Sequence, residues 1–310
     1  MIAILMSTYN GEAYLKPQLD SLLAQTVADF TLYIRDDGST DGTCALIRSY
    51  SDPRIRFEQG ENLGPAGSFF ALLNRAAQAD YLFFSDQDDV WHPDKLARML
   101  EAARPHKGEP VMVFSDFEMM DGEGRITAPS YAAYAHLQVE PGEVPLAKIL
   151  AQPYAFGCAS VITGELAKRV QHPPEGIEMH DCWMALTAAA VGRLIYLPEA
   201  TIAHRFHNAN ATGRSGQASL MARLRRITKG FSAQAENSAL RLRQVRLLLQ
   251  AHGPALKPEA EALLTRLARA MDRGRLPAVA ALAKNKVSRQ RALNTLFFYI
   301  TVLFGKGGCL

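Results

Sequence analysis

Short strand-like runs alternate with helical segments from residue 2 to residue 114, and this rhythm constrains the fold more than any other feature. Five segments predict strands, at Ile2–Met6, Phe30–Ile34, Arg54–Glu58, Tyr81–Phe84 and Val111–Phe114. The segments between them carry apolar residues at helical spacing, as Leu15, Leu19 and Leu22 do. Strands that alternate with helices form a mostly parallel sheet with helices on both faces. We therefore predict an α/β, Rossmann-like fold.

Charge divides the 310-residue chain into two parts. Residues 1–210 hold 16 Lys and Arg against 27 Asp and Glu, a net charge of −11. Residues 211–310 hold 18 Lys and Arg against 4 Asp and Glu, a net charge of +14. Such a split between the two parts favours two functions, with the basic part meeting an anionic partner.

The basic part is predicted to be helical over 220–249 and 258–273, with a final apolar helix at the end of the chain. Basic side chains alternate with leucines along the first of these segments, at Arg223, Arg225, Arg226, Lys229, Arg241, Arg243 and Arg246. Basic amphipathic helices of this kind bind anionic membrane surfaces. The apolar run 296–304 is about half as long as a membrane-spanning helix, so it is expected to dip into the surface without crossing it. A packing or oligomer surface is the alternative, and nucleic acid is disfavoured because no recognition module is present.

The cysteines and the N-terminus both favour an intracellular protein. Cys44, Cys158, Cys182 and Cys309 are scattered, with neither a disulfide framework nor a metal-ligand spacing, and they are predicted to be reduced. The first apolar run ends at Met6 and follows no basic region, so no export signal is predicted. We expect a cytoplasmic protein that binds peripherally to the inner face of the cell membrane.

Polar and acidic side chains follow three of the predicted strands. Ser7 to Glu12 follow the first strand, Asp36 to Asp41 the second, and Asp86 to Asp89 the strand at Tyr81. In an open parallel sheet, ligands bind beyond the carboxyl ends of the strands, so the three groups are expected to face one crevice. Carboxylates at Asp-x-Asp spacing suit Mg²⁺ or Mn²⁺ bound together with substrate phosphates. The alternative for the third group alone is a solvated loop in which Asp89 or Asp94 caps a helix.

Four motifs in order, "STYNGEAYL", "RDDGSTDGT", "NLGPAGSF" and "FSDQDDVWHPDKL", resemble the nucleotide-sugar domain of family 2 glycosyltransferases with the GT-A fold. The resemblance covers residues 1–210 and leaves 211–310 as a helical C-terminal extension. Together, "DQDDVW" and "HDCWMALTAAAVGRLIYLP" most resemble the bacterial rhamnosyltransferase-type members. Those members build surface polysaccharide from dTDP-L-rhamnose.

The resemblance implies a role for several residues at the strand ends. Asp88 would bind the metal and Asp86 would lie nearer the ribose. Asp37, together with Asp36, would contact the edge of the base. The remaining positions would line or border the nucleotide-sugar pocket: Thr8, Tyr9, Asn10, Glu12, Asn62 and Gly64.

Asp181, in "EMHDCWMA", is the candidate general base, because transfer to a hydroxyl needs a group that accepts its proton. It opens a predicted helix, which stabilises its anion, and an ordinary helix-capping aspartate is the alternative. By the resemblance, one base without an enzyme nucleophile implies inversion at the anomeric carbon. His180 stands where a glutamate is commoner in the family.

Late histidines complete the expected metal site. The resemblance implies His207 as the third ligand, with His204 as the alternative, and Arg205 as a partner of the diphosphate. Trp91 and Trp183 are candidates for stacking on a sugar or base, with a core position as the alternative for Trp183. The Gln-x-x-Arg-Trp box of processive synthases is missing, so one sugar or a short run per engagement is expected.

The function predicted from the sequence is an inverting, metal-dependent glycosyltransferase that acts on a glycan or polyprenyl-linked acceptor. One alternative is another UDP- or GDP-sugar donor, and a second is a non-catalytic sugar-nucleotide-binding scaffold subunit. A dinucleotide-dependent oxidoreductase is disfavoured, because "STYNGE" is not the glycine fingerprint of that class. A nucleotidyltransferase is disfavoured because Glu12 lies where a basic, glycine-rich loop is expected.

Overall fold

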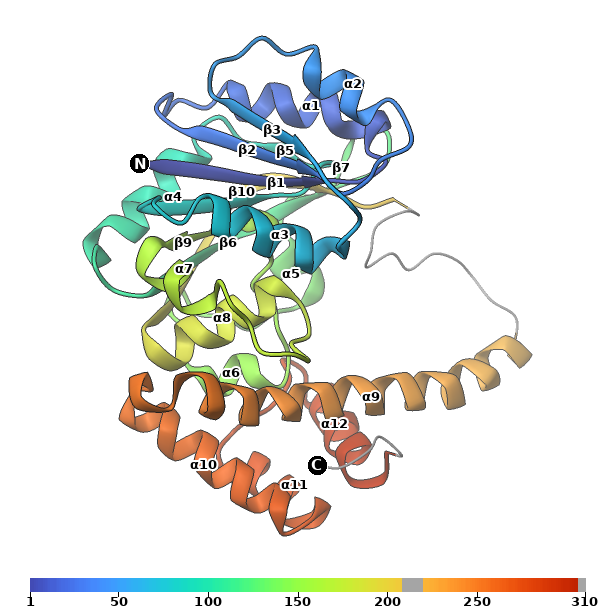
Figure 1. The fold of residues 1–310 in the computed structure, drawn as a ribbon. Helices are drawn as coiled ribbons and strands as arrows, with labels where there is room; N and C mark the ends of the chain where they lie inside the picture. Colours follow the sequence, from blue (N-terminus) through green and yellow to red (C-terminus); the bar gives the residue numbers. More distant parts are fainter. Residues whose placement is uncertain (208–219, 306–310) are drawn as a thin grey trace.

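A computed structural model describes residues 1–207 and 220–305, with the backbone alone between 220 and 230. Its strands are β1 Ile2–Thr8, β2 Thr31–Asp36, β3 Ile55–Gln59, β4 Tyr81–Ser85, β5 Val90–Trp91, β6 Val111–Met120, β7 Ile126–Ala128, β8 Gly142–Glu143, β9 Ser160–Thr163 and β10 Arg193–Arg205. Its α-helices are α1 Glu12–Leu23, α2 Thr43–Arg48, α3 Gly64–Arg75, α4 Lys95–Ala103, α5 Tyr131–Ala135, α6 Leu146–Leu150, α7 Gly164–Val170, α8 His180–Val191, α9 Leu220–His252, α10 Pro258–Asp272, α11 Arg275–Lys284 and α12 Ala292–Phe304. The α/β fold predicted from the sequence is confirmed (Figure 1).

The strands form one mixed sheet in the order β3-β2-β1-β4-β9-β6-β10-β5. Parallel pairs join β3, β2, β1 and β4, and another parallel pair joins β6 to β10. β9 lies between β4 and β6 and is antiparallel to both, so the sheet is less uniformly parallel than predicted. β10 is the longest strand among the described residues, and its last residues pair with Met119 and Met120 of β6.

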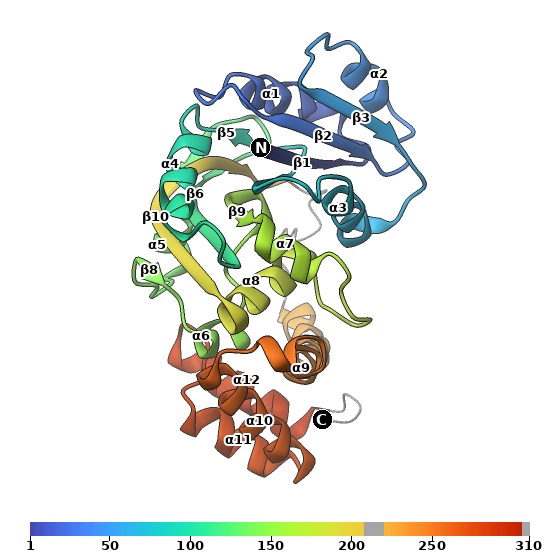
Figure 2. The same ribbon diagram turned by 60° about the vertical axis from the view of Figure 1, so that its left-hand side comes forward.

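Successive residues of β1 pack on opposite faces of the sheet, as the twofold period of a strand requires. Ile4 and Met6 belong to a core that includes Leu15 of α1 and Leu96 of α4. Ala3 and Leu5 belong to a second core, which runs from α3 through α8 to α9–α12. The C-terminal helices therefore share a continuous core with the sheet, and Figure 2 shows them beyond α6 and α8.

The second half of α9 is a packing helix, not a free amphipathic one. Leu242, Val245 and Leu248 are buried in the core that includes α8, and Arg241 is buried as well. The prediction that this apolar face binds a membrane is therefore wrong for residues 240–249, whereas Arg223, Arg225, Arg226 and Lys229 have side chains outside the described residues. Within 1–207 and 220–305, none of the helices has both the length and the apolar character needed to span a bilayer.

His252 joins α9 to α8. Its Nε2 lies 3.2 Å from Thr187 Oγ1, and its ring stacks on Trp183 with the centroids 5.4 Å apart. Burial, with a smaller contribution from Arg169, lowers the pKa of His252 to about 4. The fold therefore holds this imidazole neutral where an unfolded chain, with a pKa of about 6.5, would take up a proton.

We expect His252 to make stability fall with acidification. Its contribution is fully present above about pH 6.5 and is lost as the pH falls toward 4, because only the unfolded state gains the proton in that window. At pH 5 the loss amounts to about 2 kcal/mol of unfolding free energy. Urea unfolding at pH 7 and pH 5 measures it, with His252→Gln as the comparison. An equal acid loss in the wild type and in the variant would contradict this assignment.

Candidate active site

Three loops meet at the carboxyl ends of β1, β2 and β4. Tyr9 N donates to Gln87 Oε1 at 2.8 Å, and Gln87 Nε2 donates back to Tyr9 O at 3.0 Å. Asn10 N donates to Ser39 Oγ at 2.8 Å, and Asn10 Oδ1 accepts from Thr40 N at 2.8 Å. The three polar groups singled out in the sequence therefore lie together at one edge of the sheet.

The residues proposed for the nucleotide pocket differ in their exposure. Tyr9 is 49% exposed, and Asn10 and Asn62 are exposed beside it, so each can meet a ligand. Glu12 is exposed, but its Oε2 accepts from Gly42 N at 2.8 Å, which braces the start of α2. Gly64, the first residue of α3, has a φ of +72°, a conformation that favours glycine. The space where a Cβ would lie is open.

Thr8, Asp36 and Asp37 are buried and hold the second loop in shape. Asp36 accepts from Thr8 Oγ1 at 3.0 Å and from Ser39 N at 2.9 Å. Burial raises the pKa of Asp36, but hydrogen bonds, chiefly from Ser39, outweigh it and leave the pKa below its ordinary value. Asp37 forms an ion pair with Arg35 and accepts from Leu63 N at 2.9 Å. Both carboxylates have protein partners, and their predicted contact with a base stays a prediction.

Asp89 is the innermost acid of the "DQDD" loop. It is fully buried, and its Oδ1 lies 2.7 Å from His204 Nδ1 and accepts from Arg205 N at 3.1 Å. Burial opposes protonation of His204, but attraction to Asp89 and its neighbours raises the pKa of His204 to about 9. This histidinium–carboxylate pair ties β10 to the loop.

Lys95 and Cys158 lie beside that pair, and the sequence analysis did not identify either as part of the site. Lys95 is fully buried, donates to Cys158 O, and lies 3.6 Å from the centre of the Trp91 ring. Burial lowers the pKa of Lys95 to about 7. The one signal in the sequence for Lys95 is its place in "DQDDVWHPDKL", two residues after Pro93 and close to the acidic loop.

Asp88 and His207, the two metal ligands predicted from the sequence, face each other. Asp88 Oδ2 lies 2.8 Å from His207 Nε2, and their side chains are 14% and 13% exposed. Two adjacent ligands of one octahedral ion, each about 2.1 Å from it, stand about 3 Å apart. The spacing of 2.8 Å, here that of a hydrogen bond between the two side chains, is close to this value, so the pair could hold a divalent ion between them.

A second donor set lies deeper. Asp86, Asp89, Cys158 and His204 each offer an atom within 4.8 Å of the others. His204, whose pKa is raised to about 9, balances part of the charge of these acids. Both the deeper set and the Asp88–His207 pair are therefore candidate positions for a divalent ion.

Asp86 lies among other acids. Burial, then the charges of Asp89 and Asp88, raise the pKa of Asp86 to about 7, and Asp181 adds to this effect. Asp181 therefore lies near enough to Asp86 for the two charges to interact. So many acids at one place favour a bound cation.

Asp181 lies in the first turn of α8. Its Oδ1 accepts from Cys182 N at 2.7 Å, and its Oδ2 accepts from Gly157 N at 3.2 Å. Gly157 allows this close approach, because a Cβ there would lie 3.0 Å from His180 Nε2. His180 is buried and stacks on Phe69 with the centroids 4.2 Å apart, and burial lowers its pKa. Of the His-Asp pair, Asp181 is partly exposed, while His180 packs in the core.

Three other side chains that the sequence singled out are buried. Arg205 lies at the end of β10, donates from Nε to Asp88 O at 2.8 Å and lies over the Tyr14 ring, so it braces the loop, and its contact with a diphosphate stays a prediction. Trp91 and Trp183 are 2% and 1% exposed, so stacking of Trp91 on a ligand is not supported and the core position given as the alternative for Trp183 is confirmed. Cys44, Cys158 and Cys182 are free thiols, as predicted, and Cys309 lies outside the described residues.

Solved structures share this fold. TarS residues 1–349 of S. aureus in complex with UDP-GlcNAc superimposes with a TM-score of 0.59 at 18% identity, over 92% of this chain and 80% of that one. Mannosyltransferase PcManGT of Pyrobaculum calidifontis, in complex with GDP-Man and Mn²⁺, superimposes with a TM-score of 0.52 at 20% identity, over 97% of this chain and 85% of that one. The fold is the GT-A fold, as predicted.

A model described as glycosyl transferase family 2 matches residues 3–182, more than half of the chain. The chain belongs to glycosyl transferase family 2. The resemblance stated from its motifs is thus confirmed at the level of the family.

Curated relatives carry glycosyltransferase names. An uncharacterized glycosyltransferase of Rickettsia typhi is 25% identical over 216 residues, 68% of this chain and 66% of its own. UDP-Glc:alpha-D-GlcNAc-diphosphoundecaprenol beta-1,3-glucosyltransferase WfgD of Escherichia coli is 28% identical over 164 residues, 50% of this chain and 64% of its own. dTDP-rhamnosyl transferase RfbG of Shigella flexneri is 36% identical over 103 residues, which are 31% of this chain and 36% of its own. The chain spans less than two thirds of the length of each.

Proposed function

We propose that the chain is an inverting, metal-dependent glycosyltransferase that moves a sugar from a nucleoside diphosphate to a hydroxyl group. The observation that carries the proposal is the meeting of the loops after β1, β2 and β4 at one edge of the sheet, with His207 Nε2 2.8 Å from Asp88 Oδ2. Membership of glycosyl transferase family 2 supports the same reaction. In this proposal residues 1–210 form the catalytic part, and 211–310 form its helical extension.

Asp181 would act as the base. Its carboxylate accepts the proton of the acceptor hydroxyl as that oxygen bonds to the anomeric carbon. The bond from the anomeric carbon to the phosphate oxygen breaks, and its electron pair leaves with the nucleoside diphosphate. Mg²⁺ or Mn²⁺ bound by Asp88 and His207 would neutralise charge on that diphosphate. The Gly157 N–H and the start of α8 stabilise the Asp181 anion before transfer.

We propose dTDP-L-rhamnose as the donor and a glycan or polyprenyl-linked hydroxyl in bacterial surface polysaccharide as the acceptor. The partial likeness to RfbG supports the donor, and the name of WfgD, which includes diphosphoundecaprenol, supports a lipid-linked acceptor. WfgD also makes a UDP-sugar the principal alternative donor.

A donor panel tests the proposal. The full chain is incubated with Mn²⁺ or Mg²⁺ and with dTDP-rhamnose, UDP-glucose, UDP-GlcNAc or GDP-mannose, and both thermal stabilisation and release of nucleoside diphosphate are measured. The expected result is stabilisation and release with one donor, each reversed by a chelator. Stabilisation without release or transfer to any glycan or polyprenyl diphosphate acceptor would favour the scaffold alternative.

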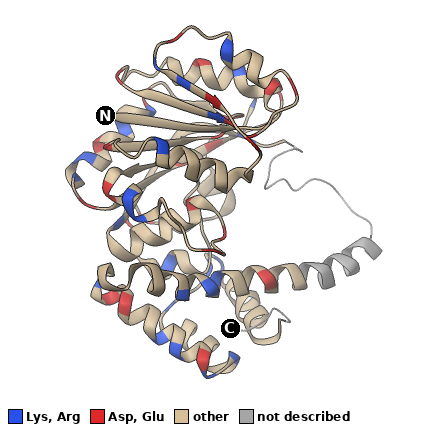
Figure 3. Ribbon diagram, in the orientation of Figure 1, with Lys and Arg blue, Asp and Glu red and all other residues tan. Residues whose placement is uncertain are grey.

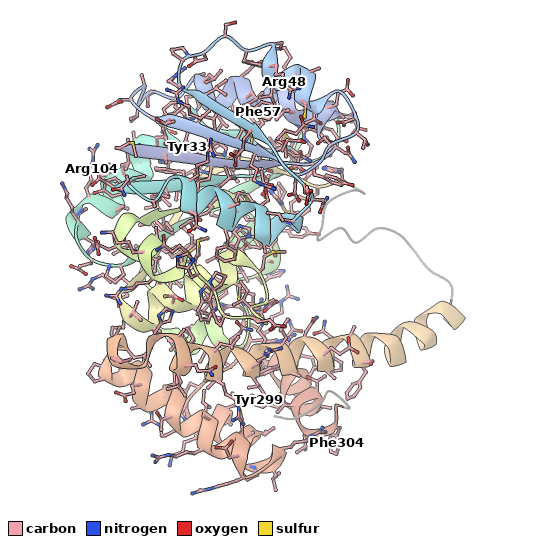
Figure 4. All side chains as sticks on the ribbon, in the orientation of Figure 1. Tyr33, Arg48, Phe57, Arg104, Tyr299 and Phe304 are labelled. Carbon is pink, nitrogen blue, oxygen red and sulfur yellow. The ribbon has the colours of Figure 1, made fainter. Side chains whose placement is uncertain are left out.

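A membrane contact is proposed at α12 in place of α9. Leu293, Leu296, Phe297 and Phe304 are 76%, 55%, 38% and 65% exposed. Their spacing places them along one side of the helix. Lys284, Lys286 and Arg291 are exposed in the segment that leads into α12. Figure 3 shows the charged residues, and Figure 4 labels Phe304 at the end of α12. An apolar stripe beside basic residues suits an anionic lipid surface.

Replacing Leu293 and Leu296 together by glutamine is expected to lower binding to phosphatidylglycerol vesicles at least fivefold, because it removes exposed apolar area without disturbing the core. Flotation of the full chain with anionic or phosphatidylcholine vesicles measures this. Ile126→Gln, at an apolar position on β7 that is 49% exposed, is the control and should float like the wild type. Equal recovery of all three proteins would rule out the α12 surface.

A further inference from the structure

The segment that leads into α8 is held by α9. Residues 171–179 contain neither helix nor strand, although they set where Asp181 stands. Gln244 Nε2 donates to Gly176 O at 3.2 Å, and Arg243 Nη2 donates to Glu175 O at 3.3 Å. Both donors belong to α9, more than sixty residues further along the chain. The C-terminal helix therefore fixes the approach to the candidate base.

Arg241 makes the closest of these connections. Its Nη2 donates to Glu178 Oε1, and its Nη1 lies 3.0 Å from Cys182 Sγ. Cys182 Sγ also lies 3.8 Å from Glu178 Oε2, so the three side chains close a ring. Glu178 precedes Asp181 by three residues, and Cys182 follows it directly. The Arg241 guanidinium therefore contacts one residue before Asp181 in the sequence and one residue after it.

Arg241 is buried, so its contacts carry more weight than those of a surface ion pair. The Arg241 side chain is 9% exposed and that of Glu178 is 23% exposed. A planar guanidinium with two fixed donors holds orientation better than a lysine ammonium does. Removing one partner of a buried ion pair is costly in free energy. The segment that carries the remaining charged side chain would shift to expose that side chain to water.

Asp181 is sensitive to such a shift. Cys182 N donates to Asp181 Oδ1 at 2.7 Å, so movement of Cys182 moves the carboxylate. Its other oxygen is held by the Gly157 N–H at 3.2 Å. Displacement of a catalytic group by about 1 Å lowers rates on the order of 100-fold.

We infer that Arg241 of α9 is a positioning residue for Asp181, acting through Glu178 and Cys182, so that the C-terminal helical region completes the catalytic centre. The inference rests on the proposed function, and it gives residues 211–310 a role in transfer that is independent of any membrane contact. We expect Arg241 to have no direct effect on donor binding. Its described side-chain hydrogen bonds go to Cys182 and Glu178, and neither belongs to the nucleotide loops or to the Asp88–His207 pair.

The test compares Arg241→Met, Arg241→Lys and Glu178→Gln with Arg246→Met in the full chain. Arg246 lies on the same helix and pairs with Asp272 on the surface, so Arg246→Met is the matched control. For Arg241→Met we expect kcat for transfer to fall 10- to 100-fold, while donor affinity, measured by calorimetry, stays within about twofold. Arg241→Lys should recover part of the loss, and Arg246→Met should match the wild type.

Two results would overturn the inference. One is wild-type kcat in folded Arg241→Met. The other is a loss that falls equally on donor affinity and on kcat, which indicates general disorder. If Arg241→Met does not fold, Glu178→Gln, which keeps the shape of the glutamate, and Arg241→Lys, which keeps the charge of the arginine, decide the question, and wild-type kcat in both would reject the role. Failure of the proposed function is distinguishable, because then the wild-type chain itself transfers no sugar.

Discussion

Replacement of Asp181 by asparagine is expected to lower kcat for sugar transfer on the order of 1000-fold while leaving donor affinity nearly unchanged. Asparagine keeps the size of the side chain, and its amide oxygen can still accept from Gly157 N. It cannot take the proton of the acceptor hydroxyl. Initial rates at saturating donor and acceptor measure the effect, and calorimetry with the donor checks that the nucleotide pocket is intact.

The control for this substitution is Asp94→Asn. Asp94 is also an aspartate at the start of a helix, α4, but it is exposed and pairs with Arg98 on the surface. Its substitution should change kcat less than about twofold. If Asp181→Asn retained more than a tenth of wild-type kcat, Asp181 would be an ordinary capping residue and the base would have to be sought elsewhere.

The convergence of the three acidic loops could be predicted from the sequence because it follows from topology alone. Parallel neighbouring strands end at the same edge of a sheet, so residues after β1, β2 and β4 had to meet. The register places Thr8 beside Asp36 and Met6 beside Ser85, which brings the loops within hydrogen-bonding distance. The positions of these polar groups directly after their strands were therefore enough to predict that the three loops meet.

The choice between His204 and His207 needed coordinates. Both follow the same apolar run, and both lie near an acid, His204 near Asp89 and His207 near Asp88. What separates them is the continuation of β10 as far as Arg205, which buries His204 and leaves His207 at the edge. That extension depends on pairing with β6, a long-range contact that local periodicity does not encode.

The role of α9 could not be predicted for a related reason. Leucines interleaved with arginines indicate a helix with an apolar face, but they do not say what covers that face. Burial of Leu242 and Val245 against α8 excludes the membrane there, and Arg241 proves to be an internal partner of Glu178. The region 131–176 is weakly patterned in the sequence, and its contributions, the antiparallel strand β9 and the Gly157 N–H that holds Asp181, depend on long-range contacts.

Asp88→Asn is the second substitution expected to have a large effect, and it tests the metal assignment. Loss of one carboxylate charge from the Asp88–His207 pair should weaken Mn²⁺ binding at least tenfold and lower kcat for transfer by roughly 100- to 1000-fold. Mn²⁺ binding is measured by electron paramagnetic resonance in the presence of nucleoside diphosphate, independently of turnover. Cys158→Ser is the matched comparison, because Cys158 belongs to the deeper donor set and should leave Mn²⁺ affinity unchanged. If Mn²⁺ binding were weaker in Cys158→Ser and normal in Asp88→Asn, the ion would have to be assigned to the buried cluster. If transfer were unchanged after chelation, the reaction would not require a metal.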